Sequence, residues 1–142
     1  MKKRLLALVL SSVAFSVMAD DNSGQDLVKR GEYLARAGDC VACHTSEGGK
    51  PFAGGLAMKT PIGTIYSSNI TPDKTDGIGN YSYDDFQKAV RQGIAKNGDT
   101  LYPAMPYPSY ASVSDADMHA LYAYFMQGVQ PVSQKDRATD IP

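Results

Sequence analysis

Both cysteines of this 142-residue chain and one of its two histidines fall within five consecutive residues, Cys40-Val41-Ala42-Cys43-His44. Such a cluster can form a redox disulfide, help to bind zinc, or attach a haem. Redox Cys-x-x-Cys pairs lie between a strand and a helix of an alternating α/β chain, whereas this cluster follows a helical pattern. A structural zinc site needs four ligands, usually from two such pairs, and the chain has no third cysteine.

Covalent haem attachment accounts for the whole cluster. In a Cys-x-x-Cys-His motif the two thiols bond to the haem vinyl groups, and the histidine that follows binds the iron. A plain disulfide between Cys40 and Cys43 would close a very short loop and add little stability. We therefore predict that Cys40 and Cys43 hold one covalently bound haem c, and that His44 is an axial ligand of its iron.

The N-terminus has the layout of a secretory signal peptide, which we assign to residues 1–19. Three basic residues precede an apolar run from Leu5 to Val17, and small residues at Val17 and Ala19 permit cleavage after Ala19. The run is shorter than the roughly 20 residues of a membrane-spanning helix, and no later segment is apolar enough to cross a bilayer. Export agrees with haem c, which is attached outside the cytoplasm, so we expect a periplasmic protein.

The charge balance excludes one class of partner. Without the three basic residues of the leader, the chain has 11 Lys and Arg against 15 Asp and Glu, a net charge of −4. Nucleic-acid-binding domains present a basic face, so we expect no nucleic-acid partner. Association with a membrane surface stays open.

Hydrophobic periodicity predicts an all-α domain over residues 20–130. Three main helices are expected, at about 26–38, 82–97 and 114–128, with Ser82 and Ser114 as N-caps. Between the first two helices, residues 45–81 are rich in glycine and proline and show no sustained period, apart from a possible short strand at 63–67. Residues 131–142 read as a polar tail or as a truncated interdomain linker. The apolar faces of the helices are short, so we expect the haem to fill the middle.

The second axial ligand is predicted to be Met105. Low-spin c-type haems usually take a methionine or histidine there. Met105 lies between Pro103 and Pro106, whose rings stiffen the loop and reduce the entropy that a weak thioether ligand must oppose. Met58 lies in a glycine-rich loop only 14 residues past His44, so the chain would have to cross the haem quickly, and Met58 is a less suitable ligand. We expect a place in the apolar core for Met118 and Met126, and a place at the surface for His119.

Four stretches carry a family resemblance, "GEYLARAGDCVACHT", "TPIGTIYSSNITPD", "GIGNYSYDDFQKAVRQGI" and "LYPAMPYPSYASVSDADMHALYAY". With the order helix, CVACH, long loop, helix, methionine loop (residues 99–110, around Met105) and helix, they resemble class I cytochrome c. The resemblance extends to the first haem domain of the cytochrome c subunits of membrane-bound alcohol and gluconate dehydrogenases, and covers most of residues 27 to 140. In this family the first and last helices cross at a contact between a glycine and aromatic residues. Gly31 with Tyr33 or Leu34, packed against Leu121 and Tyr124 or Phe125, would match that contact.

The resemblance implies a function in electron transfer rather than catalysis. It implies electron donation by a periplasmic alcohol, aldehyde or sugar-acid dehydrogenase and delivery toward ubiquinone or a terminal oxidase. Those subunits resemble three haem domains in a row, whereas this chain has one Cys-x-x-Cys-His motif, so it is either a single-haem relative or a piece of a longer subunit. With an open axial position, a haem enzyme or gas-binding sensor is the alternative function.

Polar residues around the predicted haem are candidates for its propionates. Tyr66 and Asn69 could hydrogen-bond to these buried carboxylates, and Arg91 could pair with one, because a buried carboxylate needs such partners. The residues expected to cover the haem with apolar side chains are Pro51, Phe52, Leu56, Ile65, Val90 and Ile94. Excluding water there would help to keep the reduction potential high.

Overall fold

Five α-helices, one π-helical turn and one β-hairpin make up the fold in this computed structural model, which describes residues 22–141. The predicted signal peptide, residues 1–19, lies outside the described residues. In chain order the elements are α1 (Asn22–Ala37), α2 (Cys40–Cys43), β1 (Ala57–Thr60), β2 (Gly63–Tyr66), α3 (Tyr83–Gln92), α4 (Tyr107–Tyr110), α5 (Asp115–Ala123) and the π-helical turn η1 (Tyr124–Gly128).

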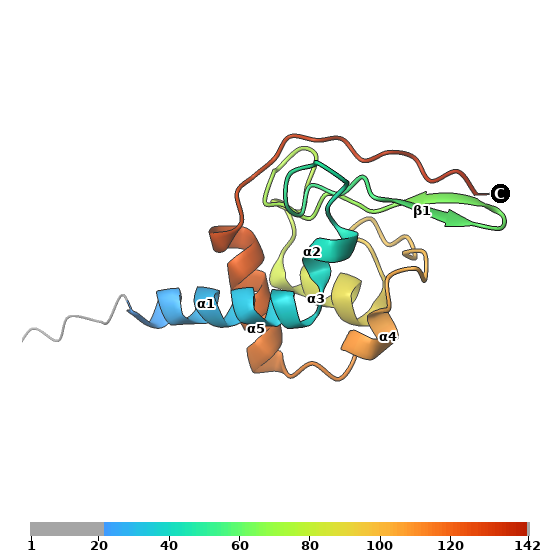
Figure 1. Cartoon of the computed structure of the whole chain (residues 1–142). Helices are drawn as coiled ribbons and strands as arrows, with labels where there is room; N and C mark the ends of the chain where they lie inside the picture. The colour runs from blue at the N-terminus through green and yellow to red at the C-terminus, as the bar shows by residue number, and fades with distance from the viewer. Residues whose placement is uncertain (1–21, 142) are drawn as a thin grey trace, which may run out of the picture.

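Helices α1 and α5 cross closely at a glycine (Figure 1). A Cβ atom on Gly31 would overlap the backbone carbonyl of Ala120 and would lie 2.6 Å from the Cβ of Tyr124. The two helix backbones can approach this closely only because Gly31 has no side chain. This confirms the predicted contact between Gly31 and Tyr124.

Local capping sets the start of two helices. The Ser82 side chain accepts a hydrogen bond from the Asp85 N–H, and the Asp85 carboxylate accepts one from the Ser82 N–H, which completes a capping box for α3. Ser114 caps α5 in the same way, through the Asp117 N–H at 3.2 Å. Both predicted N-caps are therefore confirmed.

The helix ends differ more from the sequence prediction. Helix α3 ends at Gln92 rather than at residue 97, because Gly93 takes up a left-handed conformation with φ of 66° and closes the helix. Helix α1 begins at Asn22, four residues before the predicted start at about residue 26. The last helix keeps its predicted extent, but its final turn, η1, is π-helical.

The long loop contains more regular structure than predicted. Strands β1 and β2 form an antiparallel hairpin in which Met58 faces Ile65, so the described fold is predominantly rather than wholly α-helical. The proline-rich stretch contains the one-turn helix α4, with a proline in its first turn, where a missing N–H costs nothing.

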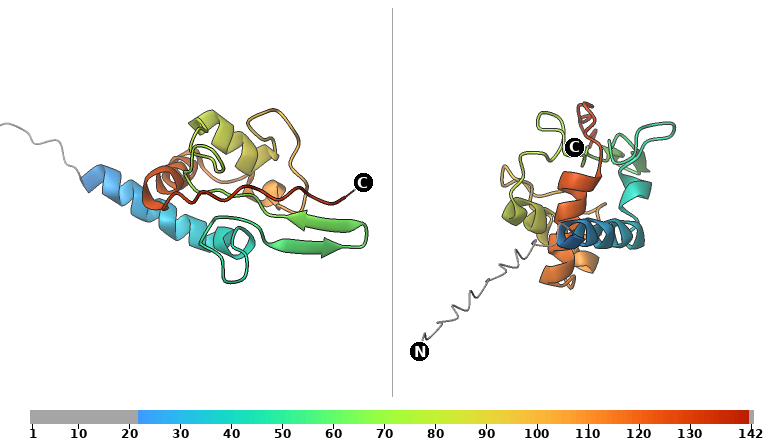
Figure 2. Two further views of the ribbon diagram at one scale, coloured as in Figure 1. Left: turned by 90° about the horizontal axis from the view of Figure 1, so that it is seen from above. Right: turned by 90° about the vertical axis from the view of Figure 1, so that its left-hand side faces the viewer.

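Residues 129–141, the C-terminal segment, lie across the loops and along the hairpin instead of extending into solvent (Figures 1 and 2). Asp140 forms an antiparallel bridge with Thr64, and the two residues exchange hydrogen bonds of 2.9 Å in both directions. The segment is thus built into the fold, although its sequence reads as a polar tail.

The buried core lies where α1, α3 and α5 meet. Phe52, Phe86 and Phe125 pack there with their rings tilted or edge-on, and Met118 is fully buried. This confirms the core role predicted for Met118. Within residues 22–141, no helix has the length and apolar character needed to cross a membrane.

Candidate haem-binding site

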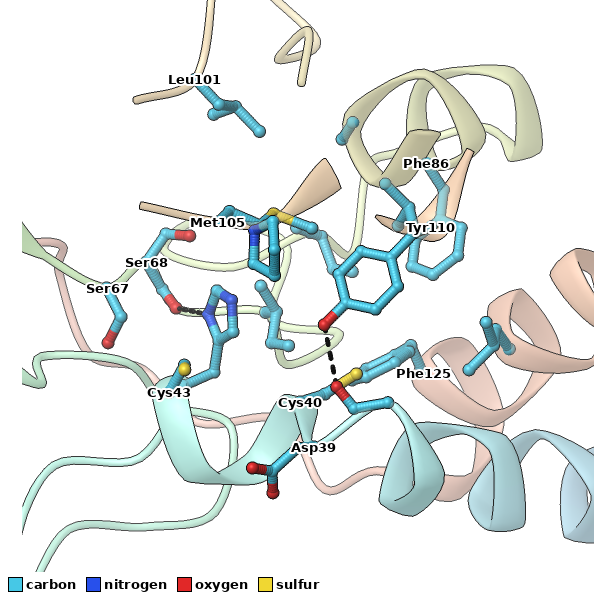
Figure 3. Close-up of a pocket in the computed structure, with 18 of the residues that line it drawn as sticks. Asp39, Cys40, Cys43, Ser67, Ser68, Phe86, Leu101, Met105, Tyr110 and Phe125 are labelled. Atoms are coloured by element: carbon cyan, nitrogen blue, oxygen red, sulfur yellow. Dashed lines mark hydrogen bonds between the residues drawn. The ribbon is translucent and has the colours of Figure 1, made fainter. Parts of the chain in front are cut away.

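A cavity of about 720 Å³ lies between α2, the hairpin, α3, the methionine loop and α5. Cys40, Cys43, His44 and Met105 all line it, although they come from two separate parts of the chain. Most of its wall is apolar, and Ile65, Phe86 and Leu121 contribute to it. Figure 3 shows Met105 across the cavity from Cys40 and Cys43. A large apolar cavity lined by two thiols and an imidazole fits the predicted haem.

The two thiols are free and lie at the ends of the short helix α2. Burial raises the pKa of Cys40 to about 11. A redox-active Cys-x-x-Cys pair needs the opposite shift, since its reactive cysteine has a lowered pKa. Across the described residues, no three His, Cys, Asp or Glu side chains converge as metal ligands. The raised pKa is the opposite of what a reactive redox cysteine at position 40 would need.

The His44 imidazole is held in one tautomer. Its Nδ1 lies 2.7 Å from the carbonyl oxygen of Ser68, and because a carbonyl can only accept, Nδ1–H must be the donor (Figure 3). Burial lowers the pKa of His44, which favours the neutral ring, although the Ser68 hydrogen bond acts in the opposite sense. In this tautomer Nε2 carries no proton, so its lone pair is available to a metal. Metal-ligating histidines are usually held in this way.

The methionine loop is braced by its own backbone. The Met105 N–H donates to the Tyr102 carbonyl at 3.3 Å, and the Met105 carbonyl accepts from the Tyr107 N–H at 2.8 Å. Met105 is half-buried and lines the cavity, as its predicted ligand role requires. Met58, on β1, also lines the cavity. Position at the cavity therefore does not by itself decide which of the two methionines would bind the iron. His119 is exposed and stacks on Tyr83, with ring centroids 3.8 Å apart.

The three predicted propionate partners are placed differently. Tyr66 lines the cavity, and its hydroxyl accepts a hydrogen bond from Arg137 at 3.1 Å. The Asn69 side chain does not line the cavity, and both protons of its amide nitrogen are used, on the Val132 and Gln134 carbonyls at 2.8 and 3.0 Å. No amide donor of Asn69 is therefore left for a haem carboxylate.

Arg91 binds protein groups on α5 and the residues before it. Its guanidinium donates to the Val113 carbonyl and to the Asp115 carboxylate, both at 2.7 Å. It is not among the residues that line the cavity, yet its buried Nε has no hydrogen-bond partner among the described residues. Its pairing with a propionate stays a prediction.

Parts of the cavity wall could not be foreseen from the sequence. The Tyr110 hydroxyl donates to the Gly38 carbonyl at 2.9 Å and so ties the methionine loop to the end of α1. Phe86, on α3, also lines the cavity. Of the predicted apolar cover, Ile65 and Val90 line the cavity. The remaining four do not: Pro51, Phe52, Leu56 and Ile94.

Known proteins share this sequence over most of its length. The cytochrome c subunit of gluconate 2-dehydrogenase from Pantoea cypripedii is 74% identical over 142 residues, which cover 100% of this chain and 32% of that protein. The cytochrome c subunit of alcohol dehydrogenase (quinone) from Gluconobacter oxydans is 55% identical, covering 98% of this chain and 29% of that protein. The cytochrome subunit of fructose dehydrogenase from Gluconobacter japonicus is 52% identical, covering 81% and 24%.

The chain therefore spans about a third of the length of the first two relatives. The family model for cytochrome c matches residues 28–128, which include the attachment motif, the methionine loop and all of α5. Members of this family bind haem c covalently, which agrees with the residues around the cavity. On this match and these identities, the chain belongs to the cytochrome c family.

Proposed function

We propose that this chain transfers single electrons through one covalently bound haem c in a class I cytochrome fold. Its place would be in the cytochrome c subunit of a dehydrogenase that oxidises an alcohol, aldehyde or sugar acid, and it would pass electrons toward ubiquinone or a terminal oxidase. One observation carries the proposal. The two thiols and the imidazole of the attachment motif share a single apolar cavity with the methionine of the proline-flanked loop.

The residues around the cavity have distinct tasks in this function. Cys40 and Cys43 would hold the haem through thioether bonds, His44 would bind the iron through Nε2, and Met105 would provide the second axial ligand. When bound, the haem supplies an iron that accepts and releases one electron. If His44 and Met105 both bound the iron, no position on it would be left for substrate, which favours electron transfer over catalysis.

The surroundings of the ligands support rapid electron transfer. The carbonyl of Ser68 keeps His44 in one orientation, and the braced backbone of the methionine loop restricts Met105. Rigid ligands rearrange little when the charge on the iron changes. Apolar side chains such as Ile65 and Leu121 exclude water and so disfavour the more highly charged oxidised state, which raises the potential.

The relatives support the choice of partner and compartment. Two of them are by name cytochrome c subunits of gluconate and alcohol dehydrogenases, and the name of the second includes a quinone. A donor of this kind and a quinone as acceptor follow by likeness. Because haem c is attached outside the cytoplasm, the proposed location is the periplasm. The proposal includes contact with the outer face of the inner membrane.

Expression of the chain with haem-maturation proteins tests this function. The periplasmic fraction should contain a red protein with one haem per chain and a low-spin spectrum. A sulfur-to-iron charge-transfer band should be present in the oxidised form. Mixed with the catalytic subunit of a gluconate or alcohol dehydrogenase and its substrate, the haem should become reduced. A variant with Cys40→Ala and Cys43→Ala should lose covalent haem and serves as the control.

Two results would contradict the proposal. A colourless exported protein would remove the haem and with it the whole function. A high-spin spectrum with rapid binding of carbon monoxide would instead indicate an open axial position, as in a haem enzyme or a gas sensor.

A further inference from the structure

A single peptide group joins the candidate iron ligand to a carboxylate on the far end of the chain. Its carbonyl, from Ser68, accepts the hydrogen bond from His44 Nδ1 at 2.7 Å. Its N–H, from Asn69, donates to Asp136 Oδ1 at 2.6 Å. The two groups belong to the same conjugated amide, so polarisation at one is felt at the other. Asp136 is thereby connected to His44 without touching it.

The carboxylate is held in this place by several anchors on the C-terminal segment. The Asn69 amide donates to the carbonyls of Val132 and Gln134, at 2.8 and 3.0 Å. The Gln134 side chain donates to the Ala53 carbonyl at 2.7 Å. The backbone before Asp136 is therefore fixed to the loop that carries Ser68 and Asn69. The anchor is itself a buried asparagine, so the segment is held in one place rather than loosely attached.

We propose that Asp136 is a positioning residue that tunes the axial histidine, and through it the reduction potential, by way of the Ser68–Asn69 peptide group. The inference rests on the proposed function, since it needs His44 to bind the haem iron. It adds to that function a residue outside the attachment motif and outside the region matched by the family model.

The sign of the effect follows from the direction of polarisation. A negative charge at the N–H end of the peptide makes the Ser68 carbonyl a stronger acceptor. The carbonyl then draws the Nδ1 proton away from the His44 ring, and the ring becomes a more electron-rich ligand. An electron-rich ligand stabilises the oxidised iron more than the reduced iron. Asp136 therefore lowers the potential, and loss of its charge should raise it.

Neighbouring charges do not cancel this contact. Arg137 points elsewhere, because its guanidinium lies over the Tyr66 ring, 4.0 Å from the centroid. The Asp76 carboxylate accepts from the Ser133 hydroxyl at 2.8 Å and adds negative charge on the same side. Burial of the carboxylate raises the pKa of Asp136, and the hydrogen bond from Asn69 opposes that shift. The residue as a whole is exposed, so its through-space field at the haem is screened by salt.

The test compares two variants of the haem-loaded protein that lose the same charge from the same segment. Asp136→Asn removes the charge but keeps an oxygen that can accept from the Asn69 N–H. Asp140→Asn is the matched control, because Asp140 is held to Thr64 through its backbone rather than its carboxylate. Reduction potentials are measured at low salt and at about 1 M salt, where the Debye length is about 3 Å.

We expect Asp136→Asn to shift the redox equilibrium about threefold toward the reduced form, which corresponds to about +28 mV. The shift should persist at high salt, and Asp136→Glu should restore the wild-type value. Asp140→Asn should shift the potential less, and high salt should abolish that shift. The sulfur-to-iron charge-transfer band should be unchanged in all variants, which shows that the ligands are retained. If Asp136→Asn gives too little holoprotein, Asp136→Ser removes the same charge and is judged by the same criteria.

Two outcomes would overturn the inference. Equal shifts for the Asp136 and Asp140 variants, or a shift at Asp136 that disappears at high salt, would reduce the effect to a surface charge. Neither outcome touches the proposed function, which fails only if the wild-type protein lacks a low-spin haem with histidine and methionine ligands.

Discussion

The imidazole of His44 depends on a carbonyl 24 positions later in the chain. The adjacent cysteines are part of a local motif, and their spacing is sufficient to predict what they bind. The Ser68 carbonyl, in contrast, is a backbone group that any residue type could provide. No sequence pattern marks it, and only the fold of the loop brings it to the ring.

Replacement of Met105 by alanine tests whether this residue is the second axial ligand. Loss of the thioether should open the iron to carbon monoxide and lower the reduction potential, because methionine ligation raises it. We expect the redox equilibrium to shift by more than about tenfold, or about 59 mV. Optical redox titration and carbon monoxide binding measure the two effects.

Met58→Ala is the matched comparison, because Met58 also lines the cavity. It should keep the charge-transfer band, bind no carbon monoxide and shift the potential much less than the Met105 variant. If instead Met58→Ala lost the band and Met105→Ala kept it, the ligand would be on the hairpin and the assignment of Met105 would be wrong.

At the scale of elements, the crossing of α1 and α5 depends on Gly31. Gly31→Ala would place a Cβ into the backbone carbonyl of Ala120, so the helices would have to separate. Overpacking of this kind costs about 1–3 kcal/mol, and we expect a loss of about 2 kcal/mol in the free energy of unfolding. Denaturant unfolding of the holoprotein measures it.

Gly24→Ala is the control for this prediction, since Gly24 lies on the same helix and no atom would lie within 4 Å of its added Cβ. Alanine favours a helix over glycine by up to about 1 kcal/mol, so this variant should be as stable as the wild type or slightly more so. Equal destabilisation by both substitutions would mean that the crossing does not need a glycine.

The same two helices are joined by an ion pair whose effect depends on pH. Arg30 Nε donates to Asp117 Oδ1 at 2.8 Å, and this hydrogen bond lowers the pKa of Asp117. A lowered pKa in the folded state stabilises the protein above the unfolded-state value of about 3.9, and this contribution is lost as the pH falls through the folded-state value.

We therefore expect the melting temperature of the wild type to fall more steeply below about pH 4 than that of Asp117→Asn. Melting temperatures measured across the acid range check this. Arg30→Gln should flatten the profile in the same way, because it removes the partner that shifts the pKa. Parallel profiles for all three proteins would show that the pair contributes nothing measurable, as for many exposed pairs.

At the scale of the whole molecule, Asn69 holds the C-terminal segment to the loop that follows β2. Its side chain donates to two carbonyls of the segment and accepts from both the N–H and the hydroxyl of Thr71. Asn69→Ala removes these four bonds and should cost about 3 kcal/mol in the free energy of unfolding. Trypsin should then cleave faster at Lys135 and Arg137, as mass spectrometry of the digest would show.

The comparison is Asn97→Ala, because Asn97 is exposed and bonds only to Asp99 nearby. A surface change of this kind should alter stability by less than about 0.5 kcal/mol, with no change in cleavage at the segment. Unaltered proteolysis of the Asn69 variant would show that the segment is held by other contacts, such as the bridge between Thr64 and Asp140.

Local features of the sequence were enough to predict the covalent haem c that membership of the cytochrome c family implies, and the starts of α3 and α5. The roles proposed for Cys40, Cys43 and His44 depend on their being neighbours in the chain, and Ser82 and Ser114 cap helices through bonds three residues away. The end of α3 was misjudged because its pattern continues past Gly93, whose positive φ and contact with the Tyr107 ring become visible only in the fold.

What the sequence by itself determined about this protein is therefore the chemistry of attachment, because thioether and imidazole bonds need particular side chains at fixed spacing. Only the tertiary structure decided how the imidazole of His44 is oriented. The Ser68 carbonyl and the Asp136 carboxylate lie far from His44 in the chain, and they meet around one peptide group through contacts between distant segments. Such contacts depend on how the loops pack, and neither composition nor periodicity encodes that directly.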